Sequence, residues 1–324
     1  MSNFCLKNSF CIFTVALTAL SFLLLNPVIS KAENNLETSL LQVKKSPNNA
    51  EAHYRLALTY GKLERYQESI ASYKKAVELK PNYPDAWYSM GLAYYNLKDA
   101  DNEMHCYKQA IKYKPDFADA HYNLGLTYFD QGNYPKAIRS NKDAIANQPK
   151  YPEAFYNMGL SYSKMGQEIE AISSYKKALA IKPTYTNAWL NMGISYGSIG
   201  KYQDEVNSYQ EVIKLDPKYV SAYYYLGMAY YSLKQYPQAE EAYKKTFELD
   251  PKFEDAHLNL GLIYDNTGKY QQAIEQYQIA AKPATKSTTT KRPTETKPAT
   301  KSTTAKRPTE AKPATKSATK FKIN

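Results

Sequence analysis

Prolines recur at one fixed interval, which constrains the fold of this chain more than any other feature of its sequence. The series consists of Pro47, Pro81, Pro115, Pro149, Pro183, Pro217 and Pro251, so every interval is 34 residues. A fixed period of this length is typical of an array in which one supersecondary unit is copied and stacked on its neighbours. The sequence therefore predicts a repeat protein.

Aligned on this period, the chain divides into seven units, each with the pattern of two helices. The units span 50–83, 84–117, 118–151, 152–185, 186–219, 220–253 and 254–281. In the third unit we expect helices over 119–131 and 134–147, with Gly132 in the turn because glycine commonly ends a helix. Pro149 stops the second helix. Places within a unit are numbered below from its first residue.

Small and large residues recur at fixed places. Place 8 is glycine in six units: Gly91, Gly125, Gly159, Gly193, Gly227 and Gly261. Place 11 is tyrosine in all seven: Tyr60, Tyr94, Tyr128, Tyr162, Tyr196, Tyr230 and Tyr264. A glycine inside a helix costs roughly 1 kcal/mol relative to alanine. We therefore expect the two helices of each unit to approach closely at place 8.

These residues resemble the tetratricopeptide repeat over residues 50–281. The resemblance rests on an aromatic at place 4 (Trp87, Phe155, Trp189), Leu/Met-Gly, the place 11 tyrosine, a small residue at place 20 and the closing proline. It implies an all-α fold, a right-handed α–α superhelix (solenoid) of antiparallel helix pairs. The concave face of such a superhelix is made mainly by the first helices.

Two units depart from the pattern at place 20, where Glu103 and Glu205 replace the small residue. We expect these glutamates to extend their charged ends to solvent across a looser hairpin. A local hinge is the alternative.

The two ends of the array differ in their apolar residues. Residues 33–49 place Leu36, Leu40, Leu41 and Val43 largely on one helical side, which predicts an N-terminal capping helix. The last helix, 270–281, has no following helix, so Ile274, Tyr277 and Ile279 are expected to form an uncovered strip. Because terminal repeats need a polar outer face, we hypothesise self-association through this last helix.

The N-terminal 32 residues have the pattern of a secretory signal peptide. An uncharged run over 10–25 is shorter than the roughly 20 residues of a membrane span. Ser30-Lys31-Ala32 gives a cleavage site after Ala32. We expect an exported protein, periplasmic or secreted, with an uncleaved membrane anchor as the alternative. After cleavage only Cys106 remains, so no internal disulfide is expected.

Residues 282–324 form a basic tail of low complexity. KPATKSTTTKRPTET at 282–296 recurs as KPATKSTTAKRPTEA at 297–311. Of the whole chain's net charge of +11, the tail holds +10, from twelve Lys/Arg and two Asp/Glu. Such a composition cannot bury a core, so we expect disorder. Contact with a polyanion or cell-wall polymer, a plain spacer and a glycosylated stalk all remain open for it, as does folding back of the tail onto the acidic residues of the groove.

No motif for catalysis, metal binding or cofactor binding was found in the sequence. It lacks C-x-x-C, H-E-x-x-H, a P-loop and G-x-S-x-G. Three of the four histidines, His53, His121 and His257, stand at place 4, where other units have aromatic residues, so we interpret them as packing residues. The protein is therefore predicted not to be an enzyme, with no metal and no cofactor.

Candidate binding residues fall on the first helices, where places 2, 5, 6, 9, 12 and 13 share one side. Place 6 carries a ladder of asparagines, Asn123, Asn157, Asn191 and Asn259, and place 5 a row of tyrosines, Tyr88, Tyr122, Tyr156 and Tyr224. A carboxamide offers both an acceptor and donors to a peptide backbone, and tyrosine is enriched in interfaces. The alternatives are ordinary exposed asparagines and tyrosines that pack between repeats.

Three functions remain open from the sequence. The first is an exported scaffold or adaptor that binds an extended polypeptide in its concave groove at the cell envelope. The second is a polyanion- or cell-surface-binding protein that acts through residues 282–324. The third is an oligomeric structural scaffold built by end-to-end stacking.

Overall fold

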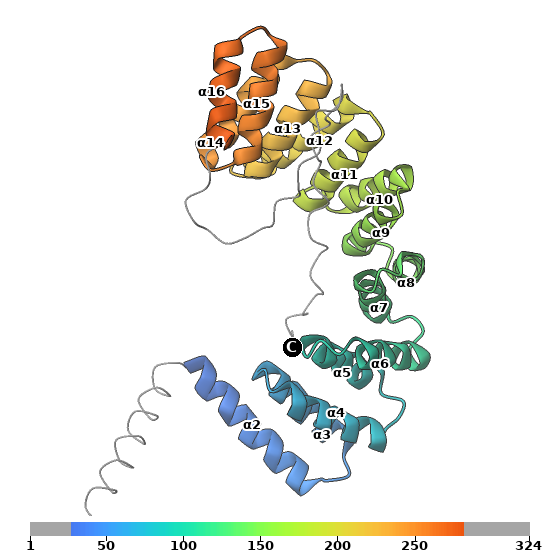
Figure 1. Cartoon of the computed structure of the whole chain (residues 1–324). Helices are drawn as coiled ribbons and strands as arrows, with labels where there is room; N and C mark the ends of the chain where they lie inside the picture. Colours follow the sequence, from blue (N-terminus) through green and yellow to red (C-terminus); the bar gives the residue numbers. More distant parts are fainter. Residues whose placement is uncertain (1–26, 282–324) are drawn as a thin grey trace, which may run out of the picture. The chain divides into compact units, whose positions relative to one another are not determined.

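The computed structural model describes residues 27–281, with side chains from residue 34 onward. The 282–324 tail and most of the predicted signal peptide lie outside the described residues. Every element in the described part is a helix (Figure 1). The helices are α2 Pro27–Lys45, α3 Ala50–Lys62, α4 Tyr66–Leu79, α5 Pro84–Asn96, α6 Ala100–Tyr113, α7 Ala118–Asp130, α8 Tyr134–Asn147, α9 Pro152–Lys164, α10 Glu168–Ile181, α11 Thr186–Ser198, α12 Tyr202–Leu215, α13 Val220–Ser232, α14 Tyr236–Leu249, α15 Glu254–Asn266 and α16 Tyr270–Ala281.

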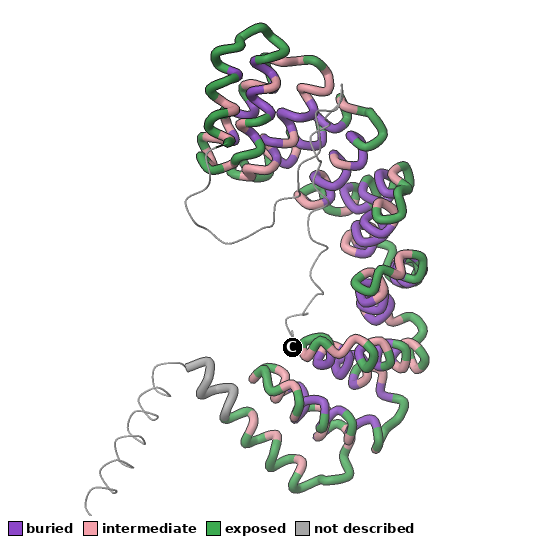
Figure 2. Tube along the Cα trace, in the orientation of Figure 1, coloured by how far each residue is buried: buried purple, intermediate pink, exposed green. Residues whose placement is uncertain are grey.

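The predicted all-α class is confirmed, and successive helices pack as pairs. The described residues fall into two compact units, divided between Gln131 and Gly132, with α2–α7 in the first and α8–α16 in the second. Within each unit every helix packs on the next one along the chain. Figure 2 shows the buried residues concentrated along the helix faces that meet their neighbours.

Helix α2 packs on α3 at the N-terminal end of the array. It begins at Pro27 rather than at residue 33, so it takes in the last six residues of the predicted signal segment. Proline is well suited to a first helical position, where its missing N–H costs nothing. Ser39 Oγ lies 3.2 Å from Thr59 Oγ1 of α3. Leu40 and Leu41 are 44% and 50% exposed, so only part of the expected apolar side is covered.

The close approach expected at place 8 joins the glycine of a first helix to the place 24 tyrosine of the second. A Cβ built on Gly159 would lie 2.5 Å from Cε1 of Tyr175, and one on Gly193 would lie 2.6 Å from Cε1 of Tyr209. Real Cβ atoms do not come so close to another atom. Tyr175 and Tyr209 are buried at 0% and 1%. The glycine therefore provides the space that the tyrosine ring fills.

The periodic proline is joined to the following helix through its carbonyl oxygen. Trp87 Nε1 donates to the carbonyl of Pro81 at 2.9 Å, and Trp189 Nε1 donates to that of Pro183 at 2.8 Å. His121 Nε2 lies 2.9 Å from the Pro115 carbonyl oxygen. These side chains all stand at place 4. A ring nitrogen at place 4 can therefore hold the proline carbonyl, which accounts for His53 and His121, whereas Phe155 has no donor and His257 Nδ1 lies 2.8 Å from Gln276 Oε1.

The expectation for the two glutamates at place 20 was wrong. Glu103 and Glu205 are 2% and 1% exposed, so their carboxyl groups do not reach solvent. Glu103 Oε1 accepts from Thr127 Oγ1 at 2.8 Å, and Glu205 Oε1 accepts from the Tyr209 hydroxyl at 3.3 Å. A buried carboxyl group needs such partners because desolvation without hydrogen bonds is costly. The hydroxyl groups of Thr127 and Tyr209 supply these hydrogen bonds.

We expect Gly159→Ala to lower the free energy of unfolding by about 1–3 kcal/mol, because the new methyl group overpacks the buried Tyr175 ring. Gly61→Ala is the matched control, since the nearest atom to its new Cβ is Ser69 Oγ at 3.5 Å. That change should leave stability unaltered or raise it by up to about 1 kcal/mol through helix propensity. Urea unfolding followed by circular dichroism measures both. Equal effects would contradict the close-approach interpretation.

Candidate polypeptide-binding surfaces

The asparagines and tyrosines predicted to face a groove are buried. Asn123, Asn157, Asn191 and Asn259 are 1%, 0%, 3% and 7% exposed. Tyr88, Tyr122, Tyr156 and Tyr224 are 8%, 1%, 0% and 5% exposed. Side chains with so little accessible surface cannot present their polar atoms to a polypeptide in this conformation.

Hydrogen bonds link the two rows to each other. The Nδ2 of Asn123 donates to the Tyr88 hydroxyl at 2.9 Å. The same bond joins Asn191 to Tyr156 at 2.8 Å and Asn259 to Tyr224 at 3.2 Å. In each pair the asparagine lies 35 residues beyond the tyrosine. The place 6 amide of one repeat therefore joins the first helix of that repeat to the first helix of the preceding repeat.

The place 5 tyrosines also pack inside their own repeat. The Tyr156 ring lies 4.8 Å from that of Tyr185 and 5.8 Å from that of Tyr175, between ring centroids. Tyr88 makes the same contacts with Phe117 and Tyr107, at 4.8 and 5.8 Å. Tilted aromatic pairs at these separations are favourable. These ring contacts lie within one repeat, and the hydrogen bonds to the asparagines of the next repeat agree with the interpretation of this row as packing between repeats.

Partly exposed apolar side chains flank the buried rows on the same helices, at places 9 and 12. They are Leu92, Tyr95 and Phe129 in the first compact unit and Ile194, Tyr231 and Leu262 in the second. The Tyr231 hydroxyl accepts from Asn266 Nδ2 at 3.0 Å. Burial, followed by the nearby Asp130 carboxylate, raises the pKa of Tyr95. Periodicity put these places on the candidate face, but it did not separate them from the buried places 5 and 6.

Two apolar pockets, absent from the sequence predictions, recur at the same places in the second and fifth repeats. One has a volume of about 400 Å³ and lies between α4, α5 and α6. The other, of about 380 Å³, lies between α10, α11 and α12. Their floors are Trp87, Met90 and Tyr94 in the first and Trp189, Met192 and Tyr196 in the second. A sequence signal existed, because these are the two repeats with tryptophan at place 4.

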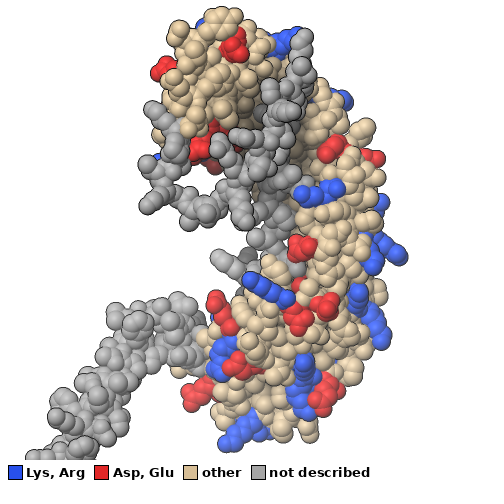
Figure 3. All heavy atoms as spheres, viewed as in Figure 1, with Lys and Arg blue, Asp and Glu red and all other residues tan. Residues whose placement is uncertain are grey.

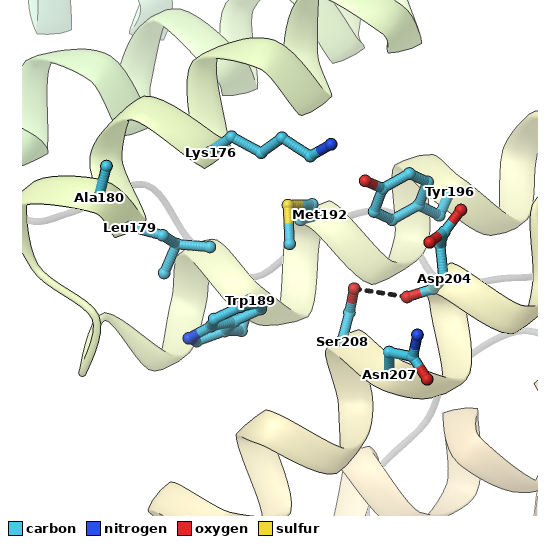
Figure 4. Close-up of a pocket in the computed structure, with 9 residues that line it drawn as sticks. All are labelled: Lys176, Leu179, Ala180, Trp189, Met192, Tyr196, Asp204, Asn207 and Ser208. Carbon is cyan, nitrogen blue, oxygen red and sulfur yellow. Dashed lines mark hydrogen bonds between the residues drawn. The ribbon is translucent and has the colours of Figure 1, made fainter.

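The pocket of the fifth repeat is drawn in Figure 4. Trp189, Met192 and Tyr196 project from α11, with Leu179 and Lys176 on one side and residues of α12 on the other. Ser208 Oγ donates to the backbone carbonyl oxygen of Asp204 at 2.7 Å. The exposed Lys176 and Asp204 place one charge of each sign at the rim. The pocket can therefore hold an apolar group while its rim contacts polar ones.

The charged and titratable groups of the pockets are held in defined states. A hydrogen bond with the Tyr196 side chain raises the pKa of Lys176, so this amine stays protonated. Its Nζ lies 5.7 Å from the centroid of the Tyr196 ring. In the second repeat, burial raises the pKa of the Cys106 thiol to about 12. The thiol is therefore neutral at physiological pH and contributes an apolar wall.

Charges elsewhere on the described surface are mixed. In Figure 3 acidic and basic side chains are interspersed among uncharged ones. Within residues 27–281, no group of three or more His, Cys, Asp and Glu side chains could hold a metal ion. None of the described helices has both the length and the apolar character needed to cross a membrane.

The last helix exposes part of the strip expected from the sequence. Ile274 and Ile279 are 48% and 36% exposed. Tyr277 is only half-buried, but its ring occupies the space beside Gly261, as place 24 requires. It is therefore a hairpin residue rather than part of a free strip. Self-association through this helix stays a prediction.

Comparisons with protein-family models identify the repeats. Matches to a model described as TPR repeat cover 60–98, 104–132, 125–166 and 198–234. Models described as tetratricopeptide repeat match 84–117, 152–185, 220–253 and 242–275. Together they take in residues 60–185 and 198–275, more than half of the chain. The chain belongs to the tetratricopeptide-repeat family. The resemblance drawn from the 34-residue period is confirmed.

Two solved structures described as TPR proteins share the fold, and a third structure is similar over a shorter part of the chain. The C-terminal part of a TPR repeat-containing protein from Cytophaga hutchinsonii is 20% identical, with 74% of this chain and 97% of that chain covered and a TM-score of 0.63. YrrB, described as a TPR protein with an unusual peptide-binding site, is 18% identical, with coverage of 61% and 97% and a TM-score of 0.52. MamA is 30% identical, with coverage of 48% and 92% and a TM-score of 0.47. A search of curated proteins found no match.

We expect Asn191→Ala to lower the free energy of unfolding by about 1–3 kcal/mol, because the fully buried Tyr156 hydroxyl loses this donor. Asn266→Ala is the matched control, since it removes a similar bond to Tyr231 from an exposed asparagine and should cost less than about 0.5 kcal/mol. A double-mutant cycle of Asn191→Ala with Tyr156→Phe, measured by urea unfolding, isolates the pair. A coupling energy near zero would contradict the ladder as a structural tie.

Proposed function

We propose that this protein is an exported scaffold, without catalytic function, that binds an extended polypeptide along the first helices of its repeats. The proposal keeps the function predicted from the sequence and moves its contact residues. Partly exposed apolar side chains at places 9 and 12, rather than the buried asparagines and tyrosines, contact the partner. The signal-like segment at 1–32 supports export and a role at the cell envelope.

The recurrence of these side chains carries the proposal. Tyr95, Phe129 and Tyr231 stand at the same place of different repeats, each partly exposed. Aromatic side chains of this kind dominate the energetics of protein interfaces. Asp85 on α5 and Asp255 on α15, both at place 2 of first helices, are exposed and favour a partner with cationic or hydrogen-bond-donating groups. The family membership and the peptide-binding description of YrrB are consistent with this function.

The alternative is binding of a polyanion through the tail. It is favoured by the twelve Lys/Arg of residues 282–324 and by their regular spacing. In that case the repeats serve as a support, and self-assembly through α16 would add a structural role.

A pull-down from envelope extract, followed by mass spectrometry, tests the proposal. The bait is the chain from residue 33 to 324, used beside a variant in which 282–324 is replaced by a Gly/Ser sequence of equal length. A polypeptide retained by both baits is the expected result. Material retained only by the native tail and eluted by moderate salt would instead support the polyanion function.

Substitutions on the first helices locate the contact. Tyr95→Ala combined with Tyr231→Ala should reduce the retained polypeptide at least tenfold, because interface aromatics each contribute more than about 1 kcal/mol. Tyr270→Ala is the matched control, since Tyr270 is 64% exposed but lies on the second helix α16. Equal loss with this control, or no loss with the double variant, would contradict the proposed surface.

A further inference from the structure

The two tryptophan-floored pockets recur in the array, and inner lining residues such as Met90, Tyr94 and Cys106 belong to the core. Trp87 and Trp189 lie three repeat lengths apart, and each pocket has the same composition of tryptophan, methionine, tyrosine and a lysine at the rim. The other residues at place 4, such as His121, Phe155 and Tyr223, are smaller than tryptophan. The two pockets share the floor and the rim lysine, but their carboxylates, Glu78 and Asp204, stand at different places of the repeat. A ligand with repeated segments can therefore meet the same floor twice.

The chemistry of the pockets selects a cyclic or aliphatic side chain that is next to a cation. Each indole is held in place by its hydrogen bond to a proline carbonyl, so the ring is a fixed surface. Aromatic-lined slots bind proline because its ring is apolar and its φ angle is already fixed, which lowers the entropy cost. Tyrosine and tryptophan faces also attract cations. Asp204 in one pocket is an exposed carboxylate, and so is Glu78 in the other, where it pairs with Lys75 Nζ at 2.9 Å.

This chain carries such a ligand in its own sequence. Every proline beyond residue 281 follows a lysine or an arginine: Lys282-Pro283, Arg292-Pro293, Lys297-Pro298, Arg307-Pro308 and Lys312-Pro313. The 15-residue segment that contains the first two pairs is repeated almost without change in the next 15 residues. A duplicated segment and a duplicated pocket therefore occur in one chain.

Length and charge are consistent with this pairing. The 43 residues beyond Ala281 can extend on the order of 140 Å at ~3.3 Å per residue. The pocket of the fifth repeat lies five helices before α16 in the same compact unit, and neighbouring helices pack about 10 Å apart. The tail has a net charge of +10, whereas the remainder of the chain is close to neutral. The tail is thus long enough to return to α10–α12. Because the rest of the chain is close to neutral, it does not strongly repel the basic tail.

We propose that the pockets floored by Trp87 and Trp189 are docking sites for the proline-basic segments of the chain's own C-terminal tail. The proline ring lies on the partly exposed indole, and the preceding lysine or arginine reaches the rim carboxylate. Occupation within one chain covers the pockets when no partner is present. Occupation by the tail of a second chain links copies of the protein.

A peptide titration tests this inference. The probe is the peptide KPATKSTTTKRPTET, and the acceptor is the chain from residue 33 with 282–324 replaced by Gly/Ser, which removes the competing tail. Trp87→Phe in this acceptor leaves Trp189 as the sole tryptophan, so its emission reports on the fifth-repeat pocket. We expect a saturable change in emission. The intact chain, whose own tail competes, should bind the peptide at least fivefold more weakly.

Two controls separate docking from charge attraction. A peptide in which Pro283 and Pro293 are alanine keeps the net charge and should bind at least fivefold more weakly. Asn207→Tyr fills the pocket mouth from an exposed site on α12 and should have the same effect. Ser173→Tyr, at the matching exposed place of α10, should leave binding unchanged.

The proposal is overturned if the alanine peptide binds as tightly as the proline peptide, or if the emission of Trp189 does not respond to either. The peptide comparison needs no substitution in the pocket, so it stands even if Asn207→Tyr lowers the melting temperature. Light scattering of the intact chain then distinguishes the two supported arrangements. A monomer with bound tail shows docking within one chain, and mass that rises with concentration and falls on adding peptide shows docking between chains.

Discussion

The contact between a glycine at place 8 and a tyrosine at place 24 sets the separation of the two helices in most repeats. Because the glycine has no side chain, the ring of Tyr175 lies directly on the backbone of α9 and is fully buried. The same contact recurs at Gly91, Gly193 and Gly227. Because the two helices of each hairpin are separated by the same distance, each hairpin presents the same surface to the next one. The contacts between successive repeats therefore recur as well. Those are the asparagine–tyrosine bonds between first helices and the donors at place 4 that hold the proline carbonyls.

Stability and binding use different places of the same repeat. Most residues at places 5, 6 and 24 and the glycines at place 8 are buried, so the polar groups there serve the scaffold. At places 9 and 12, Leu92, Ile194 and Tyr231 are partly exposed, whereas Leu126 and Leu160 at place 9 are buried. The pockets arise at the junction of successive repeats where place 4 is tryptophan. Since tryptophan at place 4 still donates to the proline carbonyl, a repeat gains the pocket floor while it keeps the interaction that histidine makes elsewhere.

The two ends of the array differ from each other, and the basic tail adds a segment outside the repeats. α2 covers one end through Ser39, Leu36 and Val43, whereas α16 leaves Ile274 and Ile279 exposed at the other. The basic charge of the chain lies beyond α16, in segments whose proline-cation pairs complement the aromatic pockets. When the tail occupies the pockets, other ligands cannot enter them. The tail would then regulate binding at these pockets.

The repeat, its period and the helix pairs follow from the sequence alone. Proline and glycine at fixed spacing end the helices, and the place 8 glycine lets the place 24 tyrosine pack against the first helix. The first helices begin at Ala50, Pro84 and the other expected unit starts. Only the tertiary structure decided which face residues are accessible. Helical periodicity groups Asn191 with Tyr231 on one side, but a neighbouring first helix buries the asparagine and leaves the tyrosine partly exposed. The pockets likewise require three helices from two repeats, so no local pattern could define them.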